Sequence, residues 1–356
     1  MSSGGASANC SRGRRCIGPD QAAAHAEVAL AGCEPAVETR WHEPCCRVRA
    51  MPDEPTPILA RHTRIGMAAL SFGVAAMMGL ASAVGIFARG DGAARRVTSI
   101  RGEVFHYATS GVYAFNAERV VAEGIGWDWF TLAVATPAML AALPLLVRGS
   151  LRGRMFALGL LGYAFYQYLM YAMTWAFGPL FPLFIGLYAT SLAGIVWIVS
   201  TIDLGAVART LGPGFPRRRM VALCSVMALM LVGMWTQRVA VGLRSETPQL
   251  FGMTTMVVQA LDLGLIVPLC LWTAVTTWRR RPVGYLLSAL LVVKGFAMAA
   301  AIVAMLLSAW AIEGEPELPA LIVFILLAAM LSWLGLRVYT AAEPRTKVFH
   351  AESVAL

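Results

Sequence analysis

Long apolar runs with few charges constrain this 356-residue chain more than any other feature. Only 14% of its residues are charged, against about a quarter in ordinary soluble domains. A helix needs roughly 20 apolar residues to cross the hydrocarbon core of a bilayer. Eight such runs occur, at about residues 66–88, 129–147, 155–176, 179–201, 220–242, 255–277, 284–309 and 319–338. The sequence therefore predicts an all-α polytopic membrane protein with about eight transmembrane helices.

The formal net charge of +9 lies mainly in alternate short connections between these runs. The basic connections contain Arg148, Arg152 and Arg154, then Arg209 and Arg217 to Arg219, then Arg279 to Arg281. The connection 311–319 carries Glu313, Glu315 and Glu317 instead. Basic connections stay on the cytoplasmic side of a membrane. We therefore expect a multi-pass protein of the cell (inner) membrane with both termini in the cytoplasm, and no nucleic-acid partner.

The ends of the chain differ in composition from its apolar middle. Residues 1–64 predict a disordered cytoplasmic segment, and 1–50 read as an upstream extension with translation starting at Met51. Five of the seven cysteines lie there without zinc-ligand spacing, so a disulfide or metal framework is the less favoured alternative. A transmembrane domain is expected over 65–342, followed by a cytoplasmic tail over 343–356. The first run also resembles a signal peptide, but it continues to Ala88, which favours a retained helix.

The only long connection between the runs covers residues 89–128. Its basic and acidic residues balance, and long loops cross membranes despite their arginines. It is rich in aromatic residues, among them Tyr107, Tyr113 and Trp127, which suit the headgroup level. We expect an ordered external cap with a short amphipathic helix over 112–122.

Two segments of the chain align with a constant offset of 131 residues, 137–163 with 268–294. Pro137 falls on Pro268, and Tyr163 falls on Lys294. Both segments start on the same side of the membrane, so the offset predicts a parallel repeat of four helices plus four helices. Prolines and arginines are also common at such places without any repeat, and that alternative stays open.

Three ionisable residues, Arg238, Asp262 and Lys294, fall inside predicted spans. Lys294 lies ~16 Å along its helix, near the bilayer centre, where a charge costs at least ~2.5 kcal/mol. Asp262 is placed a few ångströms higher on another helix. One interpretation is a buried Asp262–Lys294 pair that fixes helix register. The other is that Lys294 binds an anion or a proton.

The third span carries polar groups at helical spacing. Tyr163, Tyr166, Gln167 and Tyr171 fall on one face of a helix. Each polar group there needs a partner away from lipid. The face either lines a polar cavity opposite Lys294 or forms interhelical hydrogen bonds.

Chemistry-bearing motifs are sparse. The sequence contains no phosphate-binding loop, zinc-protease motif or nucleophile elbow. No metal site or cofactor is expected, and an enzyme would have to use Asp128, Glu123 or His106 in the outer loop.

The segment 113–172 contains Gly126-Trp127-Asp128, then 148-RGSLRG-153, and then a tyrosine-rich helix. In these motifs it resembles a family of uncharacterised bacterial and archaeal multi-pass membrane proteins. The segment 262–295 is similar in its aspartate, its arginine–proline turn and its lysine, and the likeness extends over about 105–340. The chain departs from the family at 178-GPLF-181, where an asparagine is common, and at Val147, where an arginine is common. The family implies a membrane location and no established activity.

Two hypotheses of function follow. The first is a small-molecule or ion binding or transport module, whose polar core uses Lys294, Asp262, Tyr163, Tyr166, Gln167, Tyr171 and Asp128. The second is a non-catalytic assembly, scaffold or sensory subunit that binds a membrane protein partner and whose buried charges are structural. In both, the lipid bilayer surrounds the protein.

Overall fold

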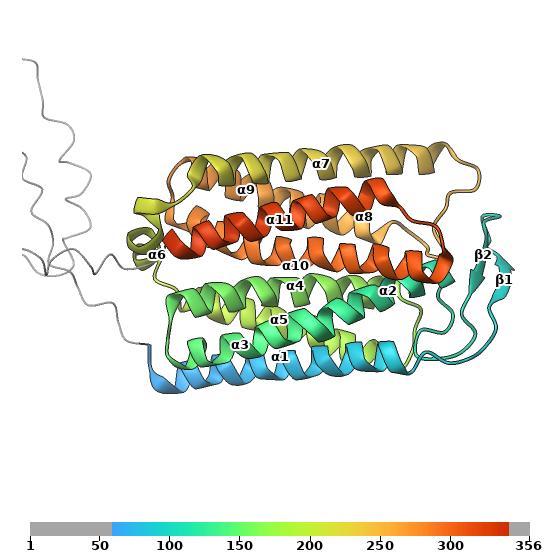
Figure 1. Ribbon diagram of the computed structural model, residues 1–356, viewed down its shortest axis with the longest axis horizontal. Coiled ribbons are helices and arrows are strands. Elements are labelled where there is room, and N and C mark those ends of the chain that lie inside the picture. The colour runs from blue at the N-terminus through green and yellow to red at the C-terminus, as the bar shows by residue number, and fades with distance from the viewer. Residues whose placement is uncertain (1–58, 342–356) are drawn as a thin grey trace, which may run out of the picture. The chain divides into compact units, whose positions relative to one another are not determined.

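The computed structural model describes residues 59–341. The expectations for the N-terminal segment before residue 59, including the start at Met51, and for the tail lie outside these residues. The first half contains α1 (Arg61–Phe87), α2 (Glu118–Phe130), the π-helical turn η2 (Thr131–Ala135), α3 (Thr136–Val147), α4 (Leu151–Thr174) and α5 (Phe181–Ser200). After α6 (Leu204–Leu211) and η3 (Gly212–Gly214), the second half contains α7 (Arg217–Arg244), α8 (Val257–Leu261), the π-helical turn η4 (Asp262–Ile266), α9 (Val267–Trp278), α10 (Pro282–Glu313) and α11 (Leu318–Ala341). The long helices lie side by side along one direction (Figure 1).

Local sequence signals set several helix ends. The Ser150 hydroxyl accepts a hydrogen bond from the Gly153 N–H at the start of α4. The Asp203 carboxylate accepts bonds from Gly205 and Ala206 at the start of α6. Gly314 ends α10 with a φ of 81°, a left-handed conformation that favours glycine. These caps place tight connections between helices that are otherwise apolar on most faces.

Within the described residues, seven helices are long and apolar enough to cross a membrane by length and composition. They include α2–η2–α3 and α8–η4–α9 as continuous helices. The eighth long helix, α4, has 24 residues, but four tyrosines and a glutamine lower its mean hydropathy. It packs against α3, α5 and α10, and its Tyr163 and Tyr168 are fully buried. The chain is an all-α polytopic membrane protein, as the apolar runs predict.

The two halves share the same sequence of conformations. Thr131 begins the first π-helical turn and Asp262 begins the second, which is the offset of 131 residues. Helices α4 and α10, which begin at Leu151 and Pro282, have the same separation. In Figure 1, α2 and α3 run in the same direction as α8 and α9, from the end with the β-strands towards the end with α6. These coincidences support the parallel repeat.

The halves differ in how their π-containing helices pack. Helix α2 lies against α10, where a Cβ on Gly126 would overlap the backbone carbonyl of Ala304. The corresponding position in the second half is Val257, whose branched side chain prevents such an approach. Helix α8 has only five residues, none of them buried. This difference leaves space between α8 and α4, because α4 is the counterpart of α10 in the repeat.

The connection before α2 differs from the expectation. It contains an antiparallel hairpin of β1 (Arg95–Thr98) and β2 (Val104–Tyr107), with Arg95 opposite Tyr107. The loop ends at Ala117 rather than at residue 128, and the helix expected over 112–122 begins only at Glu118. Its first turns continue directly into the spanning helix because Trp127 and Asp128 are buried among neighbouring elements.

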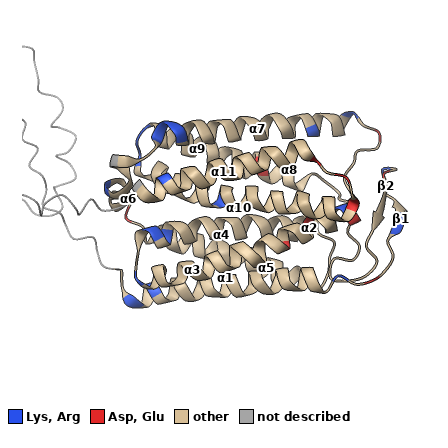
Figure 2. Ribbon diagram, viewed as in Figure 1, with Lys and Arg blue, Asp and Glu red and all other residues tan. Residues whose placement is uncertain are grey.

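Charged residues separate along the helices. Figure 2 shows lysine and arginine gathered at the end that carries α6, and most acidic residues towards the other end. The arginine connections 148–154, 209–219 and 279–281 account for the basic end. The acidic end includes Glu313 and Glu317 between α10 and α11.

Candidate binding site

A cavity of about 400 Å³ lies among α2, α4, α7, α8, η4, α10 and α11. Its walls are mostly methionine, aromatic and aliphatic side chains, with a few polar groups, including Asp262 and Lys294. This is the space left where α8 packs only lightly against α4. An apolar cavity with a small number of placed polar groups is typical of a small-molecule site.

Asp262, the first residue of η4, is held by two donors. The Tyr166 hydroxyl donates to its Oδ1 at 2.5 Å, and the Trp235 indole N–H donates to its Oδ2 at 2.8 Å. Each carboxylate oxygen thus accepts a bond within the membrane-spanning part of the protein. These bonds join α4, α7 and η4 around the cavity. The carboxylate is oriented and largely satisfied by the protein itself.

Lys294 lies in the middle of α10 and is only 6% exposed. Its Nζ is 4.1 Å from the centroid of the Tyr166 ring, which makes a cation–π contact. In the part of the chain that the structure describes, Lys294 has no hydrogen-bond acceptor and no carboxylate within ion-pair distance. Tyr166 therefore stands between Lys294 and Asp262, with its face to the cation and its hydroxyl to the anion. The direct pair considered from the sequence is replaced by this arrangement.

The first half contains the neutral counterpart of this arrangement. Thr131 and Tyr163 occupy the positions 131 residues before Asp262 and Lys294. Their hydroxyl oxygens are 2.7 Å apart, and both residues are buried. The Thr131 hydroxyl also lies 2.8 Å from the Trp127 carbonyl, to which it donates. In this half, equivalent positions close on each other; in the second, they border a cavity.

The structure brings together four of the seven predicted site residues. Lys294, Asp262, Tyr166 and Tyr171 line the cavity. Tyr163 does not, because it faces Thr131, and Gln167 is fully buried away from the cavity walls. Neither side-chain polar atom of Gln167 has a hydrogen-bond partner among the described residues. The polar face of α4 is thus divided between two surroundings.

Asp128 also lies elsewhere. Its Oδ2 accepts a 2.6 Å hydrogen bond from the Tyr113 hydroxyl, and the carboxyl is 2% exposed. Burial, then the charge of Asp128 and the hydrogen bond to it, raises the pKa of the Tyr113 phenol well above its ordinary value. This contact ties the loop before α2 to the helix itself.

The sequence pattern did not indicate the methionines or Trp235 as site residues. Eight of the 18 methionines of the chain line the cavity, which makes its walls soft and adaptable. Three of them, Met227, Met230 and Met234, share one face of α7 with Trp235 beside them. Their i, i+3, i+7 spacing was the available signal. It was obscured because α7 is apolar on its other faces too.

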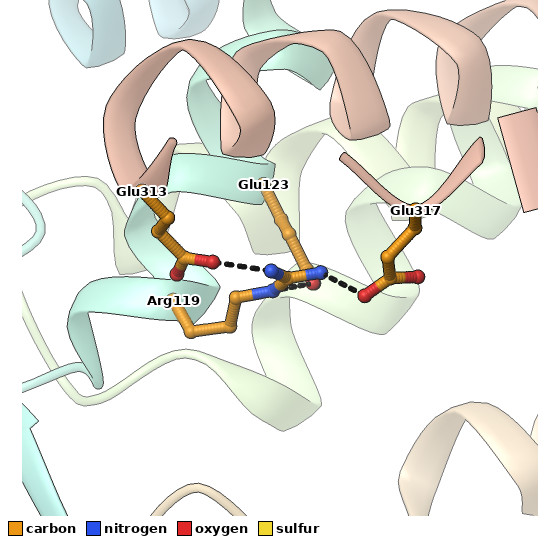
Figure 3. Close-up of polar contacts among 4 residues, drawn as sticks. All are labelled: Arg119, Glu123, Glu313 and Glu317. Carbon is orange, nitrogen blue, oxygen red and sulfur yellow. Dashed lines mark hydrogen bonds and ion pairs between the residues drawn. The ribbon is translucent and has the colours of Figure 1, made fainter. Parts of the chain in front are cut away.

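An arginine gathers three glutamates at the acidic end of the helices (Figure 3). Arg119 on α2 pairs with Glu123, one turn further, at 2.7 Å. It also pairs with Glu313 at the end of α10 and with Glu317, at 2.6 Å, just before α11. Glu123 lines the cavity. Nearby, the Phe251 N–H donates to Glu103, so the hairpin loop supports the 249–256 segment that borders the cavity.

The geometry defines a class: a multi-pass helical membrane protein with a repeated helix unit and an intramembrane cavity that a buried cation lines. Comparison with protein-family models, with curated proteins and with solved structures finds no match to the chain. The resemblance to the bacterial and archaeal membrane family stays a prediction. Within the described residues, no group of His, Cys, Asp or Glu side chains has the arrangement of a metal site.

Proposed function

We propose that the protein is a small-molecule binding or transport module of the cell membrane, and that Lys294 binds an anionic group of its ligand. The observation that carries the proposal is a buried ammonium at a cavity wall without a protein anion in contact. A charge inside a membrane normally faces a cavity and has a partner. A ligand anion is the missing partner in this proposal.

The roles of the other groups follow from their contacts. Tyr166 and Trp235 already satisfy Asp262, so Asp262 is not the main ligand contact but lowers the cost of the nearby lysine charge. The apolar walls exclude water, and in a medium of low dielectric constant an ion pair with Lys294 is stronger.

The positions of the arginines determine the proposed orientation of the protein in the membrane. We assign the end with α6 to the cytoplasm because the basic connections gather there. The end of the cavity that Glu123 lines then lies towards the outside. The described ends of the chain, at residues 59 and 341, are cytoplasmic in this assignment.

Melting of the purified protein, with and without a panel of metabolites, ions and lipids, tests the proposal. Binding at 100 times Kd stabilises the folded state by about 2.7 kcal/mol, which a melting curve resolves. We expect Lys294→Met to melt at or above the wild-type temperature, because it removes an unpaired buried charge. We expect it to lose a ligand-induced shift that the wild type shows.

The scaffold or sensory alternative has the opposite signature. Lys294→Met would then melt well below the wild type, and adding Asp262→Asn would restore the melting temperature, because the two charges would compensate each other. No ligand of the panel would shift the melting temperature of the wild type. That combination of results would overturn the binding proposal.

A further inference from the structure

The gap between α7 and α11 is the feature that carries this inference. In the first half, α1 packs against α5 and α4. Helix α7, which occupies the corresponding place in the second half, packs along α9 and η4. Within the described residues it makes no comparable packing with α10 or α11. The second half is therefore open on a side where the first half is closed.

The cavity reaches this gap from inside. Met227, Met230 and Met234 of α7 and Phe324 and Leu327 of α11 line it, and all five are partly exposed. The outer faces of the same helices are apolar and exposed: Leu229 is 74% exposed and Leu326 is 64% exposed. Such faces contact lipid tails in a spanning helix. The gap therefore joins the cavity to the hydrocarbon core.

One end of the gap is closed by aromatic and basic residues. The Arg219 guanidinium of α7 lies 5.0 Å from the ring centroid of Trp333 on α11. Arg337 of α11 lies 5.5 Å from the same ring. The first contact joins α7 to α11 at the basic end, whereas the second lies within α11, so the opening lies beside the cavity.

The chemistry of the walls indicates what fits there. Methionine side chains adapt to a flexible apolar chain better than branched ones do. A volume of about 400 Å³ suits one small ligand and is small for a phospholipid with two acyl chains. Lys294, a buried cation at the cavity wall without a protein anion in contact, calls for one anionic group.

We infer that the ligand is a single-chain amphiphile with an anionic headgroup, taken from the bilayer between α7 and α11. Its headgroup pairs with Lys294, and its chain lies along the methionines of α7 and towards the gap. This inference rests on the proposed function, because it specifies the ligand class of the same cavity. Carboxylate and phosphate headgroups satisfy the same chemistry.

Melting in phosphatidylcholine nanodiscs tests the ligand class. The probes are palmitate, hexadecyl phosphate, hexadecanol, butyrate and inorganic phosphate, each with wild type and Lys294→Met. We expect palmitate or hexadecyl phosphate to stabilise the wild type, with apparent affinity reduced at least about tenfold in Lys294→Met. Hexadecanol, which lacks the charge, and the short anions, which lack the chain, should give much smaller shifts.

The outcomes separate the two proposals. If butyrate or inorganic phosphate gives a Lys294-dependent shift and the long-chain anions give none, the amphiphile inference is wrong and the binding proposal stands. If hexadecanol binds as well as palmitate in both proteins, the anionic headgroup has no role and the inference is wrong. If no anion gives a Lys294-dependent shift, both proposals fail.

A matched pair of variants tests where the alkyl chain of the ligand lies. Leu327→Trp fills the cavity side of α11, whereas Leu326→Trp adds the same bulk to its exposed side. Photolabelling with a diazirine-bearing palmitate should fall to less than half in Leu327→Trp, with labelled peptides from α7 and α11 in the wild type. Leu326→Trp should label like the wild type. Equal labelling of the two variants would overturn the placement of the ligand's alkyl chain in the gap between α7 and α11.

Discussion

The Lys294 ammonium lies 4.1 Å from the ring centroid of Tyr166, a phenol whose hydroxyl is bonded to a carboxylate. The Tyr166 side chain thus contacts the Lys294 cation with its ring face and donates a hydrogen bond to the Asp262 carboxylate with its hydroxyl. The hydrogen bond to Asp262 increases electron density in the ring, which favours the cation above it. This relationship makes Tyr166 the residue whose changes separate the two interactions.

Tyr166→Phe keeps the ring and removes the hydroxyl. We expect a loss of about 1.5–3 kcal/mol in the free energy of unfolding, because Asp262 loses a donor in a low-dielectric setting. Tyr166→Leu should lose roughly a further 0.5–2 kcal/mol with the cation–π contact. Unfolding in mixed micelles as a function of denaturing detergent measures both. Equal stabilities of the two variants would mean that the ring face contributes nothing.

The hydrogen bond between Thr131 and Tyr163 is expected to stabilise the first half. Thr131→Val leaves the buried Tyr163 hydroxyl without its partner, at a cost of about 1–3 kcal/mol. Thr136→Val is the matched control, since the Thr136 hydroxyl is buried without a partner in the described structure. It should be neutral or stabilising in the same unfolding assay. A similar loss in both variants would contradict the role of the bond.

Gly85 provides room for the contact between Tyr113 and Asp128. A Cβ at this position would overlap both the Tyr113 hydroxyl and the Asp128 carboxylate. We expect Gly85→Ala to lower the free energy of unfolding by about 1–3 kcal/mol through overpacking. Gly73→Ala on the same helix meets nothing within 4 Å and should be neutral or stabilising. Thermal melting of the two variants side by side checks this difference.

Arg119 is expected to hold the acidic end of the cavity together. Arg119→Gln leaves Glu123, Glu313 and Glu317 close to one another without their common cation. The melting temperature should fall at low salt and partly recover as sodium chloride rises, because salt screens repulsion between partly exposed carboxylates. Arg96→Gln in the exposed β-strand is the control and should show no salt-dependent loss. A loss in Arg119→Gln that does not change with salt would argue against repulsion.

The apolar runs and the offset of 131 residues predicted the class of fold and its repeated order, because span length and turn chemistry are local properties of a sequence. They also predicted that Lys294 and Asp262 belong to one region. The spacing of the polar residues on α4 did not predict which of them line the cavity. Helix α4 is enclosed by several helices, so residues on adjacent sides of it have different neighbours. The sequence did not predict the hydrogen bond from Trp235 to Asp262, because this bond depends on the rotation of α7 about its axis. A helix that is apolar on all faces does not specify that rotation in its sequence pattern.

The loop boundary shows the same limit. Tryptophans at 127 and 129 suit a headgroup level as well as a helix interior, and the sequence does not distinguish these surroundings. Packing decides it: Gly126 lets α2 approach α10, and the helix extends back to Glu118. A glycine in an apolar run indicates that another helix packs closely there, but it does not indicate which helix.

The paired π-helical turns have a consequence for how such a chain diverges after duplication of an ancestral helix unit. One copy keeps the neutral residues Thr131 and Tyr163 closed on each other at these two positions, so it preserves the architecture. The other copy is then free to lose close packing and to acquire charges at the same two positions. Selection on the first copy would act through folding, and selection on the second through the molecule it holds.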